Sequence, residues 1–173
     1  MQAEIRSRVR KFCEDQGFTN DEGLWFKRGS NWMCYVTIPR GEVPRMCEID
    51  VVYWIMTDTQ RYEKSMRIQA HLFVEIIEGV LQDAIKRLCV DVWSKVLVDV
   101  GFKLSFPCKH FTLVDLLDEL DVMLDGYHYE LVRYYDGWEV SGDMALTYKR
   151  CPDLINAIAG TLYLWKKRKN EEE

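Results

Sequence analysis

The sequence lacks any apolar run long enough to cross a lipid bilayer. Its longest strictly apolar stretch is 51–56, whereas a transmembrane helix needs roughly 20 apolar residues. The first residues, MQAEIR, carry charge at the place where a secretory signal peptide has its apolar segment. We therefore expect a cytoplasmic protein without a membrane-spanning helix or an export signal.

Motifs of nucleotide-dependent and hydrolytic enzymes are also missing. The ten glycines form neither of the glycine-rich nucleotide-binding fingerprints. The three histidines, His71, His110 and His128, form no recognisable motif with a serine or cysteine nucleophile. We therefore assign no catalytic residue and expect a protein that is not an enzyme.

The cysteine pattern argues against both a disulfide framework and a zinc site. The six cysteines are dispersed along 173 residues, and a chain of this length can build a core without disulfides. Cys108 and His110 are the only closely spaced Cys/His pair, and no second pair follows at zinc-finger spacing. We expect reduced, mostly buried thiols and neither a bound metal nor another cofactor.

Charge is unevenly distributed along the chain. The net charge is −5, which disfavours direct binding to a phosphate backbone. The segment 112–126 contains five acids and no base, so its charge alone equals the net charge of the whole chain. Its acids are Asp115, Asp118, Glu119, Asp121 and Asp125.

In the first half of the chain, periodicity predicts a helix, a hairpin and a strand. Residues 2–15 have helical apolar spacing, and 24–27 with 32–38 form a hairpin pattern. The apolar run within 47–56 predicts a central strand covered on both faces. Residues 60–88 fit both a strand and a helix, and length and composition favour the helix; 90–100 stays open.

In the second half, Thr112 and Asp115 match a helix-capping signature that precedes a stripe of leucines. Alternation over 127–135 and 138–141 predicts a hairpin that turns at Asp136-Gly137. A third strand is predicted at 144–148, and Pro152 is expected to be the first residue of a closing helix.

These elements predict an α+β protein made of two successive helix, three-stranded antiparallel meander, helix units. We expect an N-terminal unit at 1–100, a linker at 101–111 that contains Pro107, and a C-terminal unit at 112–173.

The stretch 111–167 combines the acidic leucine helix, the hairpin segment 135–140 (YDGWEV) and a closing helix. In these features it resembles small accessory proteins of phages and prophages of the anti-CRISPR type. The resemblance covers about a third of the chain and transfers no functional residue. It implies inhibition of a host defence nuclease.

The acidic helix offers a physical basis for such a role. Carboxylates three or four residues apart on a helix lie about 5–6 Å from each other at Cβ, so an acidic stripe can compete for a groove that holds phosphates. We therefore expect a non-enzymatic protein-binding module, an inhibitor of a CRISPR-Cas or other nucleic-acid-handling enzyme. The five acids would be its partner-binding residues; a merely solvated helix face is the alternative.

Two further alternatives remain open. Glu48 and Asp50 lie two apart on a predicted strand and therefore on one face, where they could hold the divalent metal of a nuclease. The second alternative is a nucleic-acid-binding regulator that uses a basic cluster on the first helix. That cluster consists of Arg6, Arg8, Arg10 and Lys11.

Overall fold

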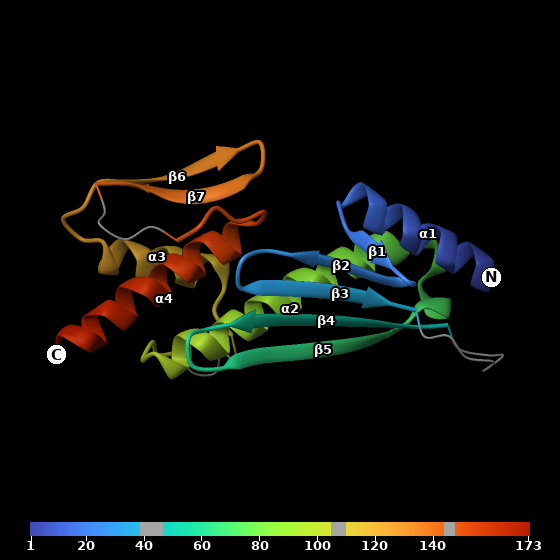
Figure 1. The fold of residues 1–173 in the computed structure, drawn as a ribbon, viewed down its shortest axis with the longest axis horizontal. Coiled ribbons are helices and arrows are strands. Elements are labelled where there is room, and N and C mark those ends of the chain that lie inside the picture. Colours follow the sequence, from blue (N-terminus) through green and yellow to red (C-terminus); the bar gives the residue numbers. More distant parts are fainter. Residues whose placement is uncertain (39–46, 105–109, 144–147) are drawn as a thin grey trace. The chain divides into compact units, whose positions relative to one another are not determined.

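The computed structural model describes residues 1–38, 47–104, 110–143 and 148–173 (Figure 1). It confirms a mixed α+β protein. Contacts divide the chain into two compact units, Met1–Val92 and Trp93–Glu173. The division falls inside helix α2 (Ile77–Asp99), whereas the sequence placed it at 101–111. None of the described helices combines the length and apolar composition needed to span a bilayer.

The first unit contains one five-stranded antiparallel sheet in the order β1-β2-β3-β4-β5, instead of the predicted three strands. Helix α1 (Gln2–Asp15) precedes the sheet, and two short 3-10 turns followed by α2 come after it. The strands are β1 (Thr19–Asp21), β2 (Leu24–Arg28), β3 (Trp32–Thr37), β4 (Glu48–Met56) and β5 (Arg61–Gln69).

Helix α1 forms where its apolar spacing predicts it. Ile5, Val9, Phe12 and Cys13 recur every three or four residues and are all buried. Gly17 follows with φ of +74°, a left-handed conformation that glycine adopts without strain. The chain can therefore leave the helix and turn back to form β1.

Strand β4 is covered on one face, and the prediction that both faces are covered is wrong. From Glu48 to Ile55 its residues alternate between half-buried and buried, and Ile49, Val51, Tyr53 and Ile55 form the buried set. Buried residues of α1 and of the first part of α2 supply the other side of this core. Figure 1 shows the first part of α2, up to Val92, running behind the sheet.

Residues 61–69 form strand β5, so the helix favoured for the start of 60–88 is wrong. All nine residues pair with β4 in antiparallel register, and Tyr62 and Ile68 are buried on the core side. This long ladder, together with the buried side chains, outweighs the helix propensity of the Glu, Lys, Arg and Gln residues. The helical part of the segment begins only at Ile77.

The second face of the sheet carries half-buried aromatic and aliphatic side chains. Trp54 Nε1 donates a hydrogen bond of 3.3 Å to the Tyr35 hydroxyl, and the Arg61 guanidinium lies 4.7 Å from the centre of the Trp54 ring. Phe26, Met33 and Val52 belong to the same face by register. We call these five apolar residues the open sheet face.

The second unit contains the end of α2, α3 (Leu113–Met123), β6 (Tyr129–Tyr134), β7 (Gly137–Gly142) and α4 (Leu154–Glu172). Pro152 is not the first helical residue as predicted. Asp153 caps α4 instead, because its carboxylate accepts a hydrogen bond of 2.8 Å from the Asn156 amide, and proline has no side-chain acceptor.

The hairpin of β6 and β7 is confirmed, but its turn lies one residue earlier than predicted. Tyr134 pairs with Gly137, so Tyr135 and Asp136 form the turn. Gly137 belongs to the strand, with φ of +149°, and a Cβ atom there would lie 2.2 Å from the carbonyl oxygen of Cys151. The predicted third strand falls mostly on 144–147, outside the described residues.

We expect Gly137→Val to lower the melting temperature. The substitution introduces a β-branched side chain at a φ that favours glycine and against the Cys151 backbone, so it should cost about 2–4 kcal/mol. Thermal unfolding followed by circular dichroism measures the loss. Gly79→Ala is the control, because a Cβ atom at Gly79 meets no heavy atom within 4 Å. An unchanged melting temperature for Gly137→Val would contradict the close approach.

Candidate functional site

Helix α3 begins with the capping box that the sequence predicts. The Thr112 hydroxyl accepts a hydrogen bond of 3.2 Å from the Asp115 amide, and the Asp115 carboxylate accepts bonds of 2.7 Å from the Thr112 amide and hydroxyl. These bonds to the charged form lower the pKa of Asp115. Asp115 therefore serves to start the helix.

Asp121 also has a structural contact. Its carboxylate accepts a hydrogen bond from the hydroxyl of Tyr129 on β6. Burial, together with this bond to a carboxylate, raises the pKa of Tyr129 to about 12. The bond joins α3 to the hairpin, so Asp121 contributes both to the fold and to the surface on which it is exposed.

Two exposed valines share a face of α3 with an exposed acid. Val114 and Val122 are 65% and 75% exposed, and Asp118 is exposed on the same side by helical spacing. Asp125 is exposed in the turn that follows the helix. Within the described part of the chain, neither carboxylate has a hydrogen bond or an ion pair. We call Val114, Asp118, Asp121, Val122 and Asp125 the outer α3 face.

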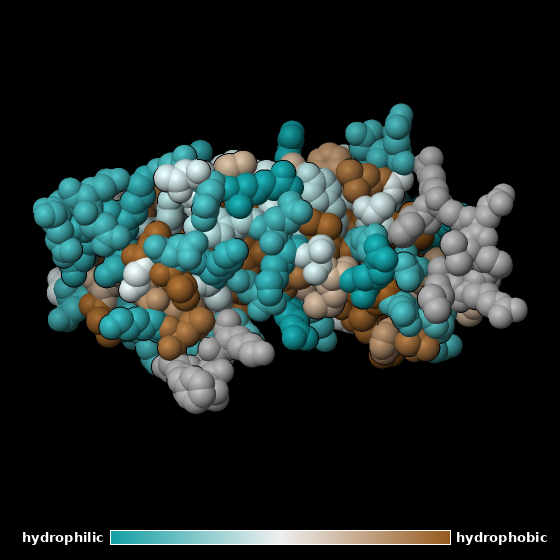
Figure 2. Space-filling model, turned by 90° about the horizontal axis from the view of Figure 1, so that it is seen from below, coloured by the Kyte–Doolittle hydropathy of each residue, from teal (hydrophilic) through white to brown (hydrophobic). Residues whose placement is uncertain are grey.

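The valines distinguish this face from an ordinary solvated helix surface. Single exposed apolar residues are normal on protein surfaces, and Figure 2 shows brown apolar groups scattered among teal hydrophilic ones on the side it displays. On α3, however, two of them lie on the same helix face as Asp118 and Asp121, while Leu116, Leu120 and Leu124 are buried. Packing among the described residues does not explain their position.

The proposed metal carboxylates, Glu48 and Asp50, do lie on one face of β4, but an arginine joins them. Arg67 lies directly opposite Asp50 on β5. Its Nε is 2.9 Å from Asp50 Oδ1 and its Nη1 is 3.4 Å from Glu48 Oε2. The hydrogen bond to Asp50 and the two negative charges raise the pKa of Arg67. A single side-chain cation therefore pairs with both acids.

A metal-dependent nuclease usually adds a further acid and a lysine to such a carboxylate pair. The nearby Glu63 and Lys64 form ion pairs with other residues. Glu63 forms an ion pair with Arg61, and Lys64 lies 3.7 Å from Asp91. Among the described residues, no group of three or more potential metal ligands converges. The described residues therefore do not form the metal site that the spacing of Glu48 and Asp50 on a strand allows.

The basic cluster of α1 separates into two parts. Arg8 lies 3.5 Å from Glu4 and 3.6 Å from Glu78. Arg6 and Arg10 instead line an open pocket of about 400 Å³. Arg6 and Arg10 are exposed and four residues apart, which the sequence alone shows for a helix. That Trp25 lines the same pocket is apparent only from the fold.

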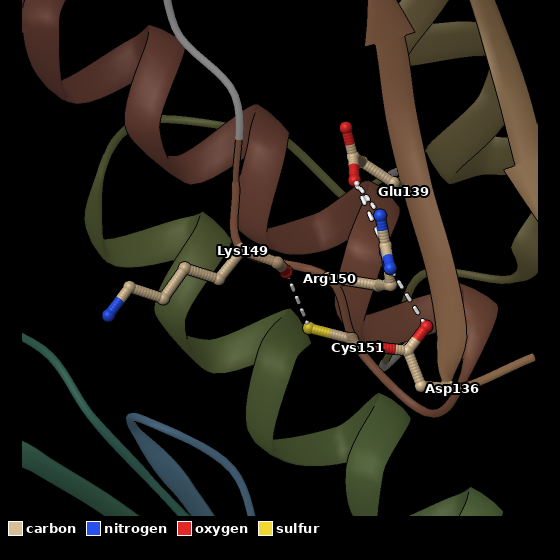
Figure 3. A network of polar contacts seen from close by, with 5 residues as sticks. All are labelled: Asp136, Glu139, Lys149, Arg150 and Cys151. Carbon is tan, nitrogen blue, oxygen red and sulfur yellow. Dashed lines mark hydrogen bonds and ion pairs between the residues drawn. The ribbon is translucent and has the colours of Figure 1, made fainter. Parts of the chain in front are cut away.

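Arg150 forms ion pairs with two carboxylates of the β6–β7 hairpin (Figure 3). Its Nη1 is 2.9 Å from Asp136 and its Nη2 is 3.3 Å from Glu139, while its guanidinium lies 3.6 Å from the centre of the Tyr134 ring. The hydrogen bond to Asp136 is the main reason that the pKa of Arg150 is raised. Sequence reasoning did not find this network, because it requires the register of β6 and β7.

The five described cysteines are free and buried, as predicted. Burial raises the pKa of Cys13 and of Cys151 to about 12, so both thiols stay protonated at neutral pH and are poor nucleophiles. The Cys151 thiol donates to the carbonyl of Lys149 (Figure 3). The Cys108–His110 pair cannot be placed, since Cys108 lies outside the described residues.

Comparisons with known proteins supply no further assignment. No protein-family model matches the chain, and searches of curated proteins and of solved structures found no similar protein. The resemblance to anti-CRISPR proteins stays a prediction, and function has to be inferred from the surfaces described above.

We expect Thr112→Ala to destabilise the protein by about 1 kcal/mol at neutral pH, the usual effect of removing an N-cap. The folded-state pKa of Asp115 is lowered, so this stabilisation is present above the ordinary carboxyl pKa of about 3.9 and is lost as the pH falls through the lower folded value. Urea unfolding at neutral and acidic pH measures the difference.

Asp118→Asn provides the matched control, because Asp118 is exposed and outside the capping box. We expect its unfolding free energy to stay within about 0.5 kcal/mol of the native value. Equal losses in Thr112→Ala and Asp118→Asn would contradict the separation of the acids into capping and surface groups.

Proposed function

We propose that this protein is a non-enzymatic protein-binding module that acts in the cytoplasm through the outer α3 face. Its partner is a nucleic-acid-handling enzyme such as a CRISPR effector, which it inhibits by occupying a basic groove. The observation that carries the proposal is the presence of two exposed valines and two carboxylates on one face of a capped helix, with a third exposed carboxylate in the turn after it.

The charge on this face suits a groove that normally holds phosphates. Asp118 and Asp121 are three residues apart on α3, so their side chains lie side by side on the helix, and Asp125 adds an exposed carboxylate in the turn that follows. A basic groove attracts these carboxylates over long distances, which accelerates association at low salt. The other two acids of the segment, Asp115 and Glu119, are less exposed.

The valines give the face an apolar component that charge alone would lack. Protein interfaces have an apolar centre with a polar rim, and burial of apolar area contributes about 25 cal/mol per Å². Val114 and Val122 are two helical turns apart, so both can enter one interface. The capping box and the buried leucines hold α3 in place, which reduces the ordering cost of binding.

We expect a photo-crosslinking amino acid at Val122 to capture the partner in cells that naturally produce this protein. The same amino acid at Lys86, an exposed residue of α2 in the first unit, is the control. Mass spectrometry should identify a protein that crosslinks from position 122 and not from position 86. Equal capture from both positions would contradict a specific outer α3 face.

We further expect the triple variant Asp118→Asn, Asp121→Asn, Asp125→Asn to bind the captured partner at least ten-fold more weakly. Asparagine keeps an oxygen that can accept the Tyr129 hydrogen bond, so the fold should be retained. The control variant neutralises Glu14, Asp15 and Asp83, which are exposed acids of the first unit. Binding of the native chain should also weaken with salt. A triple variant that binds like the native chain would leave the acids without a binding role.

The nuclease alternative has a direct test. The purified protein is incubated with several nucleic-acid substrates, with and without Mg²⁺ or Mn²⁺. Because Arg67 bridges Glu48 and Asp50, we expect no metal-dependent cleavage. Cleavage that disappears in Asp50→Ala would replace the binding proposal with an enzyme.

A further inference from the structure

The first unit contains an open pocket that neither the fold nor the proposed function explains. Its volume is about 400 Å³, within the range of small-molecule sites. Helix α1 contributes Arg6 and Arg10, strand β1 contributes Asn20, the β1–β2 turn contributes Glu22, and β2 contributes Trp25. Elements from both the helix layer and the sheet therefore meet at its walls.

Two arginines of α1 line this pocket. Arg6 and Arg10 are four residues apart, so their Cβ atoms lie about 5–6 Å from each other. Among the described residues, neither guanidinium has an ion pair or a side-chain hydrogen bond, whereas Arg8 between them has two carboxylates. Like charges at this spacing destabilise a helix, and a bound anion would remove that repulsion.

Strands β1 and β2 contribute a polar and an aromatic side chain to the pocket. Trp25 is half-buried and pairs directly with Asn20 across the β1–β2 ladder. An indole ring stacks on planar ligands, and a side-chain amide offers both donors and an acceptor to the edge of such a ligand. The pocket therefore combines side chains that can bind a phosphate with side chains that can bind a nucleotide base.

The turn at the pocket holds an unusual backbone conformation. Asp21 pairs with Leu24, so Glu22 and Gly23 form a two-residue turn with φ of +48° and +92°. Such turns favour Asn or Asp before glycine, and Glu22 is the only described non-glycine residue with positive φ. The turn places a carboxylate at the pocket, where it can accept hydrogen bonds from sugar hydroxyls.

We infer that this pocket binds a free mononucleotide. Arg6 and Arg10 hold its phosphate, Trp25 stacks on the base, and Glu22 accepts hydrogen bonds from the ribose. A single nucleotide fits better than a nucleic-acid strand, because a chain of net charge −5 repels an extended polyanion. This site belongs to the first unit and does not depend on the outer α3 face.

Isothermal titration calorimetry with AMP, GMP, CMP and UMP tests the inference. We expect at least one of these nucleotides to bind. The corresponding nucleoside and inorganic phosphate should each bind at least ten-fold more weakly than that nucleotide. A ten-residue single-stranded DNA should bind no more tightly than the best nucleotide. Affinity should fall as salt rises.

Four variants separate the roles of the pocket residues. The double variant Arg6→Ala, Arg10→Ala should weaken nucleotide binding at least ten-fold, and Trp25→Leu should weaken it without changing phosphate binding. Glu22→Gln should tighten phosphate binding, since it removes a negative charge, and should reduce the preference for ribose over deoxyribose. Lys11→Ala removes one exposed positive charge from the same helix outside the pocket and should change nothing.

Circular dichroism of each variant ensures that a loss of binding is not a loss of fold, and the exposed arginines allow the test even if Trp25→Leu unfolds. Three results would overturn the inference: no binding of any of the four nucleotides at millimolar concentration, an equal loss in Lys11→Ala and in the arginine variant, or binding of the single strand alone.

Discussion

The second unit depends on two neighbouring polar side chains at the end of α2. Trp93 is buried, and its indole N–H donates to the Asn156 side chain of α4, which itself donates to the capping residue Asp153. Ser94 accepts a hydrogen bond of 2.8 Å from the Phe111 amide, just before α3. A buried polar group without a partner costs about 1–3 kcal/mol. These bonds therefore hold the first residues of α4 and the residue before the α3 cap against α2.

The two proposed sites use different physical means. The outer α3 face combines exposed valines with acids, which suits a protein partner with a basic surface. The pocket beside α1 is small and combines two arginines with a tryptophan, which suits a small anionic aromatic ligand. The open sheet face adds a third surface whose apolar residues are only half-buried. The described residues thus present several distinct surfaces on which a partner or ligand could bind.

Local signals in the sequence predicted local structure well. The spacing in 2–15 and the Thr112–Asp115 signature depend on residues within one or two helical turns, and both predictions are confirmed. Residues 61–69 were misassigned because their pairing with β4 outweighs their helix propensity. The roles of Asp121 and of the Glu48–Asp50 pair could not be predicted, because Tyr129 and Arg67 reach them only through tertiary contacts and strand register.

Helix α2 carries core residues of both units on consecutive turns. Leu88 and Val92 are buried in the first unit, and Trp93 and Leu97 in the second. An α-helix advances about 100° per residue, so a single-residue insertion between Trp93 and Leu97 would rotate Leu97 by that angle relative to Trp93. Leu97 would then turn out of the core of the second unit while Trp93 stayed aligned with Asn156. Length changes within this part of α2 are tolerable only near whole numbers of turns, which makes helical phase a constraint on how this chain can evolve.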